Sequence, residues 1–186
     1  NSPYYRTTAT PVASLERAIT QVGTQGLRSL IATALVQPVL TGDTGRFSRF
    51  PERIWEYTVY VATAAEAHAN RFEEADGFAA QLLGLLQGLG AIVVYRVLHE
   101  QYAAHPELEP DPAAYALLLE ARTGPTARRI AEAWELSGPL AATLEETVDS
   151  ADFAAASPLA RSLRFGRIAG ALVFLCRMGR IGEVPA

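Results

Sequence analysis

The apolar run from Phe78 to Leu98 constrains the fold of this 186-residue chain more than any other segment. It carries no charged side chain before Arg96, and glycines interrupt it most densely in the stretch Gly84-Leu-Leu-Gln-Gly-Leu-Gly90. Removing apolar surface from water is worth roughly 25 cal/mol per Å², so a segment this apolar is expected in a core. The rest of the chain must therefore be built around it.

We predict that this run forms two helices, Glu74–Gln87 and Ala91–Gln101, joined near Gly88 and Gly90. Glycine is a common helix terminator, which favours a break between them. Taken alone, residues 91–95 (Ala-Ile-Val-Val-Tyr) would also fit a buried strand. Helical periodicity on both sides favours a helix.

The rest of the chain also has helical periodicity. Asp111-Pro112 and Ser157-Pro158 each place a capping side chain before a proline suited to a first helical turn. Gly124-Pro125 is predicted to end one helix and separate it from the next. Further helices are expected at residues 15–22, 26–40, 52–70, 111–123, 126–135, 138–147 and 157–178. The prediction is an all-α fold, a compact helical bundle of about eight helices in one domain over residues 1–186, with a loose tail at 179–186.

Composition and charge exclude several classes of function. The formal net charge is −4, so no excess of positive charge favours nucleic acid. The single cysteine, Cys176, cannot form a disulfide within the chain, which fits a reducing cytoplasm. No uncharged apolar run is expected to reach the length of a membrane span. All basic residues are arginine, which with frequent alanine indicates a bacterium with a GC-rich genome.

Several segments resemble one family in their order and spacing. Asn1-Ser2-Pro3-Tyr4-Tyr5 and the stretch from Val12 to Leu30 are similar to its first two motifs. Trp55-Glu56-Tyr57-Thr58 is similar to a W-x-H-S helix start, and Ala80–Gly90 to the helix that carries the His-Asp pair of HD-type metal phosphohydrolases. Ala133-Trp134-Glu135-Leu136 is a weaker likeness to a W-G-L-P segment. Together they resemble the HD-related output domain, or HDOD, family.

The resemblance places degenerate residues at the metal positions of an HD site. The first histidine corresponds to Tyr57, and the His-Asp pair to Gln87 and Gly88. A further histidine would fall near Thr147 and the final aspartate near Gly166. Glycine has no side chain, and a neutral amide is a poor ligand for a divalent metal. We expect no catalytic residue, metal or cofactor here, and a hydrogen bond between Tyr57 and Gln87 where the metal would sit.

The resemblance implies a non-catalytic signalling module that acts through protein partners in a bacterial regulatory protein. A residual metal-dependent phosphohydrolase ranks last among the alternatives, because the ligand positions are lost. In the family several helices precede the segment that begins here at Asn1. The resemblance therefore implies a domain truncated at its N-terminal side, with apolar surface left exposed and a tendency to form homo-oligomers.

Two arginine groups are candidates for binding phosphate. They are Arg161, Arg164 and Arg167, spaced i, i+3 and i+6 in the last predicted helix, and Arg46, Arg49 and Arg53 near an earlier helix start. A guanidinium donates paired hydrogen bonds to phosphate, so a nucleotide second messenger such as cyclic di-GMP is an alternative ligand. Salt bridges to the many glutamates are the favoured interpretation, because no glycine-rich phosphate loop accompanies the arginines.

The three histidines, His68, His99 and His105, are not spaced as metal ligands. No H-x-x-x-H or H-x-x-E-H pattern relates them. We interpret them as polar residues at the surface or near helix ends.

Overall fold

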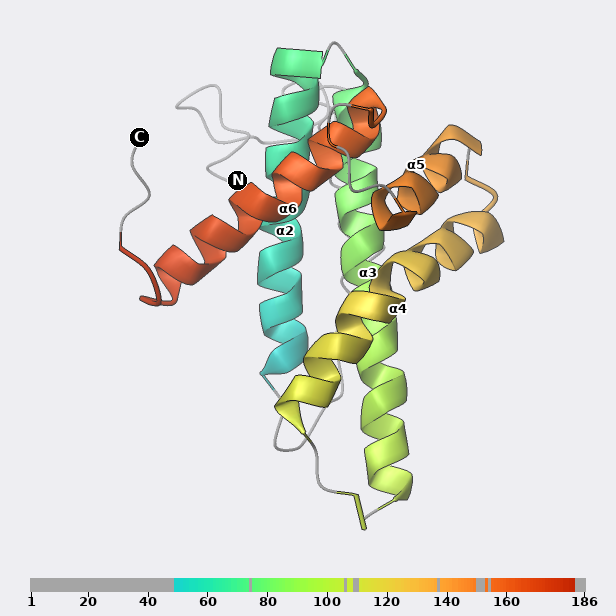
Figure 1. Ribbon diagram of the computed structural model, residues 1–186, viewed down its shortest axis with the longest axis vertical. Coiled ribbons are helices and arrows are strands. Elements are labelled where there is room, and N and C mark those ends of the chain that lie inside the picture. The colour runs from blue at the N-terminus through green and yellow to red at the C-terminus, as the bar shows by residue number, and fades with distance from the viewer. Residues whose placement is uncertain are drawn as a thin grey trace, which may run out of the picture.

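The computed structural model describes residues 49–73, 75–105, 107–108, 111–136, 138–149, 153 and 155–182. Helices occupy nearly all of this part, and no strand occurs among the described residues, which confirms the all-α class. The elements are α2 (Phe50–His68), a short π-helical turn η3 (Ala69–Glu73), α3 (Gly77–Ala104), α4 (Pro112–Ala133), α5 (Gly138–Asp149) and α6 (Pro158–Arg177) (Figure 1). The helices predicted at 15–22 and 26–40 lie outside the described residues, as do residues 183–186 of the predicted tail.

The central apolar run forms one helix, so the prediction of two helices with a break at Gly88 and Gly90 is wrong. α3 continues through both glycines and through residues 91–95, which excludes the strand alternative. The glycines mark places where another helix comes close. A Cβ built on Gly84 would lie 2.7 Å from Cα of Ala62 in α2, and one on Gly90 would lie 2.6 Å from the carbonyl oxygen of Thr123 in α4. A helical glycine costs about 0.5–1 kcal/mol, and close packing of two backbones offsets this cost.

The predicted break at Gly124-Pro125 is also wrong, because α4 runs through Pro125. Interior proline costs about 3 kcal/mol, so packing on both sides of it must hold the helix together. Before the proline, Tyr115 packs with Ile92 and Tyr95 of α3. After it, Ala127 and Ala131 are fully buried in the main core cluster. One straight α3 thus supports both halves of α4. These two mergers explain why the described part has fewer helices than predicted.

Local capping sets the helix starts that the sequence marked. Asp111 accepts a hydrogen bond from the backbone N–H of Ala113 at 2.9 Å, and Ser157 accepts one from Ala160 at 3.3 Å. Each cap is followed by proline in the first turn, as predicted. Asp76 caps α3 through the N–H of Phe78 at 2.9 Å. The helix starts predicted from a capping residue followed by proline are therefore confirmed, whereas the helix ends predicted from glycine are wrong.

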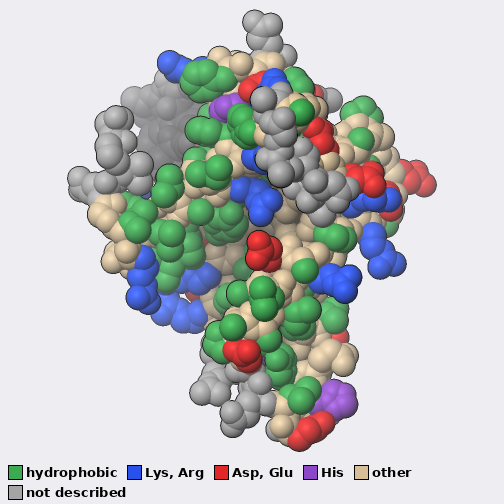
Figure 2. Space-filling view, in the orientation of Figure 1, with side chains coloured by type: hydrophobic (Ala, Val, Ile, Leu, Met, Phe, Trp, Pro, Cys, Tyr) green, Lys and Arg blue, Asp and Glu red, His purple; other side chains and the backbone are tan. Residues whose placement is uncertain are grey.

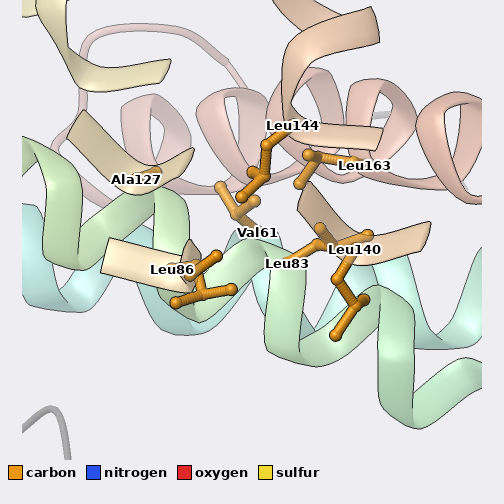
Figure 3. Close-up of a cluster of buried hydrophobic side chains, with 8 residues drawn as sticks. Val61, Leu83, Leu86, Ala127, Leu140, Leu144 and Leu163 are labelled. Atoms are coloured by element: carbon orange, nitrogen blue, oxygen red, sulfur yellow. The ribbon is translucent and has the colours of Figure 1, made fainter. Parts of the chain in front are cut away.

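The five α-helices share one core. α2 runs beside α3, α6 crosses α2, and α4 and α5 lie along the other side of α3 (Figure 1). Side chains from all five meet in a buried cluster, shown in Figure 3, that contains Val61, Leu83, Leu86, Ala127, Ala131, Leu140, Leu144 and Leu163. α6 approaches α2 closely because Gly166 and Gly170 face Val61. A Cβ on either glycine would lie within 2.9 Å of the Val61 backbone.

α3 is also the one described helix that is long and apolar enough to cross a membrane by length and composition. The expectation that no run reaches this length is therefore wrong. Within this fold, 72% of its most apolar window is buried. The central helix of a water-exposed domain has the same properties, because it is covered by protein on all sides.

Candidate functional site

A cavity of about 510 Å³ lies between α2, α3, α4 and α6. Three of the predicted degenerate positions, Tyr57, Gln87 and Gly88, line it together. The other described lining residues are Ile54, Thr58, Val61, Gly84, Ala91, Leu119, Glu120, Thr123, Gly124 and Arg167. Figure 2 shows a hollow in the middle of this face, with acidic and basic side chains beside it. The structure thus brings the α2 and α3 parts of the predicted site into one place.

Gly88 is the point where α3 meets a side chain of α2. A Cβ added to Gly88 would collide with Thr58, whose own Cβ would lie 2.7 Å away and whose Oγ1 and Cγ2 would be closer still. Thr58 is almost fully buried, and its hydroxyl donates to the carbonyl oxygen of Ile54 at 2.7 Å. The space for a side chain at position 88 is therefore already filled. Thr58 follows Tyr57 directly, but no signal in the sequence alone marks it as a residue of the site.

Tyr57 points toward α6, and its predicted hydrogen bond to Gln87 is not formed. Its hydroxyl donates to the backbone carbonyl of Arg167 at 3.2 Å, and its ring packs edge-on against Phe174 with centroids 6.1 Å apart. Burial raises the pKa of the Tyr57 phenol, and the nearby Arg167 guanidinium partly offsets this shift. Tyr57 thus ties α6 to α2 at the edge of the cavity.

Of the two remaining predicted positions, Gly166 does not belong to the described cavity lining. Gly166 lies at the crossing of α6 and α2, where a Cβ would be 2.6 Å from the carbonyl oxygen of Val61. It is a packing glycine, and an aspartate would not fit there. Thr147 belongs to α5, and its side chain lies outside the described part.

The described donors do not fit a divalent metal. No group of three or more His, Cys, Asp or Glu residues converges anywhere in the described ranges. In the cavity, Glu120 is the one carboxylate among the described lining residues, and it stands beside a phenol, an amide and hydroxyls. Such neutral oxygens and a single carboxylate make a weak set for metals that HD-type sites hold with imidazole and carboxylate.

The arginines near the start of α2 form local ion pairs. Arg49 lies 4.0 Å from Glu52, and Arg53 lies 2.9 Å from Glu56. Both are i,i+3 pairs on the helix surface, as the salt-bridge interpretation expects. Arg46 lies outside the described residues.

The three arginines of α6 point to three different surroundings. The Nε atom of Arg161 lies 3.0 Å from both carboxylate oxygens of Glu73, and its Nη1 donates to the carbonyl of Ala156 at 2.8 Å. This pairing lowers the pKa of the Glu73 carboxyl. Arg164 reaches the carbonyl oxygen of Glu146 in α5 at 3.5 Å. Arg167 alone of the three lines the cavity.

His68 has a structural setting at the end of α2. Its Nδ1 lies 3.1 Å from the hydroxyl oxygen of Ser162, and its ring stacks on Phe165 at 4.4 Å between centroids. The Ser162 hydroxyl donates its proton to the carbonyl of Pro158 at 2.9 Å, so His68 Nδ1 must be the donor in the shared contact. His105 lies beside Glu107 at 3.0 Å, on an exposed turn.

Comparisons with known proteins agree with this architecture. The crystal structure of a proposed metal-dependent phosphohydrolase from Shewanella amazonensis SB2B is similar with a TM-score of 0.64 and 18% sequence identity. The alignment covers 98% of this chain and 63% of that one, so this chain spans less than two thirds of the neighbour's length. At this identity the likeness concerns the fold alone. No curated protein matches the chain at a significant level.

A family model described as HDOD domain matches residues 1–150. The match includes α2, α3, α4 and α5, and therefore Tyr57, Gln87 and Gly88, whereas α6 lies beyond it. Since the match covers most of the 186 residues, the chain belongs to the HDOD family.

Proposed function

We propose that this chain is a non-catalytic regulatory HDOD module that acts through protein contacts in a bacterial cytoplasm. The observation that carries the proposal is the filling of position 88 by Thr58. An HD site needs imidazole and carboxylate groups converging on one metal, whereas here a tyrosine, an amide and a glycine stand at those positions. Loss of the ligands and occupation of their space together argue against hydrolysis.

The exposed face of α6 supports the protein-contact part of the proposal. Phe165, Ile168, Leu172 and Leu175 follow one another at i, i+3, i+7 and i+10, and all are exposed, Ile168 most of all at 63%. The opposite face of the same helix, with Leu163, is buried in the core. Apolar side chains gather on the part of the surface that α6 occupies (Figure 2). A contiguous apolar stripe of this kind is typical of an interaction surface.

Metal content and hydrolysis test the non-catalytic part. The purified chain is expected to hold no stoichiometric transition metal by inductively coupled plasma mass spectrometry. It is also expected to leave bis(p-nitrophenyl) phosphate and cyclic di-GMP intact in the presence of added Mn²⁺ or Fe²⁺. Hydrolysis that is abolished by Gln87→Ala would show that the site is active and would overturn the proposal.

The apolar stripe is tested by self-association. We expect Ile168→Glu to shift the chain toward the monomer in sedimentation velocity, because a charge in the middle of the stripe opposes its burial. Val97→Glu is the matched control, since Val97 is 52% exposed on α3, away from α6. Equal effects of the two substitutions would mean that the α6 stripe has no special part in association.

A further inference from the structure

A second hollow lies between α3 and α4 and shares no lining residue with the cavity described above. Its volume is about 220 Å³, and no residue of α2 or α6 lines it. The lining of this α3–α4 groove is apolar except for one threonine and one arginine: Val93, Val94, Val97, Leu98, Leu118, Arg122 and Thr126. A groove between two packed helices has the shape that accepts the side chains of a third helix.

The apolar part of the α3–α4 groove is open to solvent. Val97 of α3 is 52% exposed and Leu118 of α4 is 38% exposed. Valine is also a poorer helix former than the straight-chain residues, so helix propensity does not explain its place at an exposed helical position. Single exposed apolar side chains are ordinary, whereas apolar side chains that converge on one groove from two helices are typical of an interaction surface.

Arg122 supplies the charge of the groove. It is the one charged residue in the lining, and no ion pair joins it to a carboxylate among the residues that the structure describes. Arg128, on another face of α4, lies 2.8 Å from Glu132 and 2.7 Å from Glu145. The fold therefore neutralises Arg128 internally, whereas the Arg122 guanidinium beside the apolar lining can pair with a carboxylate of a partner.

Arg129 continues the positive charge along the same face of α4. It follows Arg122 by seven residues, which is two helical turns or about 10 Å along the axis. Arg129 is exposed, and it also has no ion pair within the described ranges. On α3, Glu100 lies one turn beyond Val97 but is not among the lining residues. A row of two cations thus borders an apolar groove in a chain whose formal net charge is −4.

We infer that the α3–α4 groove binds an amphipathic helix of a partner protein, with the apolar face of that helix in the groove and two acidic side chains on Arg122 and Arg129. Such helices present apolar residues at i, i+3, i+4 and i+7, a length that matches the spacing of the two arginines. An extended peptide would need the edge of a sheet, and the described part of the chain contains no strand. The groove is separate from the α6 stripe, so the inference goes beyond the proposed function.

Fluorescence anisotropy of the full chain with labelled synthetic peptides tests the inference. The probe is a helix-forming peptide of about 16 residues, with leucines at i, i+3 and i+7 and two glutamates two turns apart. The matched peptide has lysine in place of each glutamate. The acidic peptide is expected to bind saturably and about tenfold more tightly than the lysine peptide. Arg122→Glu should weaken binding of the acidic peptide by about tenfold and strengthen binding of the lysine peptide.

Two further variants locate the bound peptide. Val97→Ser should weaken binding of the acidic peptide several-fold, because it removes apolar surface from the groove. Arg180→Glu is the matched control for Arg122→Glu, since Arg180 is exposed and lies beyond the end of α6, and it should leave binding unchanged. Circular dichroism of each variant separates lost binding from lost folding.

The absence of saturable binding of the acidic peptide by the unmodified chain would overturn the inference, as would equal affinities for the two peptides. Binding that Ile168→Glu abolishes and Arg122→Glu leaves intact would place the peptide on the α6 stripe and contradict the groove. Self-association that Arg122→Glu reverses would identify a second copy of this chain as the occupant and would also overturn the inference. The proposed non-catalytic role is tested separately by metal content and hydrolysis, so failure of the peptide to bind would leave that role standing.

Discussion

Two faces of α3 differ sharply although they belong to the same helix. Leu83 and Leu86 are fully buried in the cluster that all five described α-helices share. The cavity is lined instead by Gly84 and Gln87, each the next residue after one of these leucines, and by Gly88. One face is filled by apolar side chains, and the other leaves space among polar groups. A single core helix can therefore hold the fold together on one face and line a cavity on the other.

The largest effect is expected on the filled face. Leu83→Ala should lower the free energy of unfolding by about 2–5 kcal/mol, because it removes buried methyl groups and leaves a cavity. Urea denaturation measures the change. Leu117→Ala on the exposed side of α4, where Leu117 is 67% exposed, should change it by less than about 0.5 kcal/mol. Similar losses for both would show that Leu83 is not in a close-packed core.

A smaller loss is expected at Gly88. Gly88→Ala should destabilise the fold by about 1–3 kcal/mol, because the new methyl group collides with Thr58 despite the better helix propensity of alanine. Thr58→Ala removes the two nearest atoms and should relieve part of the cost. A double-mutant cycle measures the coupling between the two positions. Additive effects would contradict direct contact between them.

The link between α2 and α6 should contribute less again. Tyr57→Phe removes the hydrogen bond to the carbonyl of Arg167 and should cost about 0.5–1.5 kcal/mol in urea denaturation. Tyr102→Phe is the control, since the Tyr102 ring stacks on Tyr115 of α4 and its hydroxyl makes no hydrogen bond within the described residues. A Tyr57→Phe effect no larger than the control would mean that the phenol does not hold α6.

The smallest effect is expected away from both faces, at Arg161. Because Arg161 lowers the pKa of Glu73, the pair stabilises the fold above the unfolded pKa of glutamate, about 4.3. This stabilisation is lost as the pH falls through the lower pKa of the folded state. Arg161→Ala should therefore destabilise the fold at pH 7 and converge with the unsubstituted chain at acidic pH. A pH-independent difference in melting temperature would indicate a packing effect instead.

Part of this architecture could be predicted from the sequence, and particular residues show why. Asp111-Pro112 and Ser157-Pro158 mark helix starts correctly, because a cap needs only the residues beside it. Gly88 and Gly124-Pro125 were predicted as breaks and are helical. A glycine that ends a helix and one that admits a neighbouring helix look alike in sequence, since the neighbour comes from a distant segment.

The candidate site was predicted in the same uneven way. Tyr57, Gln87 and Gly88 were identified through the family resemblance, and they do lie together. Thr58 was missed, because its role depends on α3 passing directly above it. Their regular spacing predicts that Arg161 and Arg167 act together. In the structure Arg161 pairs with Glu73, whereas Arg167 lines the cavity.

Local signals in the sequence are enough to predict that this protein is helical, that α4 and α6 begin where they do, and that the run from Phe78 to Leu98 lies at the centre. Periodicity and capping act over one or two turns, so they can be read along the chain. The packing of distant segments determines which glycines contact another helix, what fills the space at Gly88 and which arginine lines the cavity. These depend on the angle and distance at which helices cross, and residues far apart in the chain determine both.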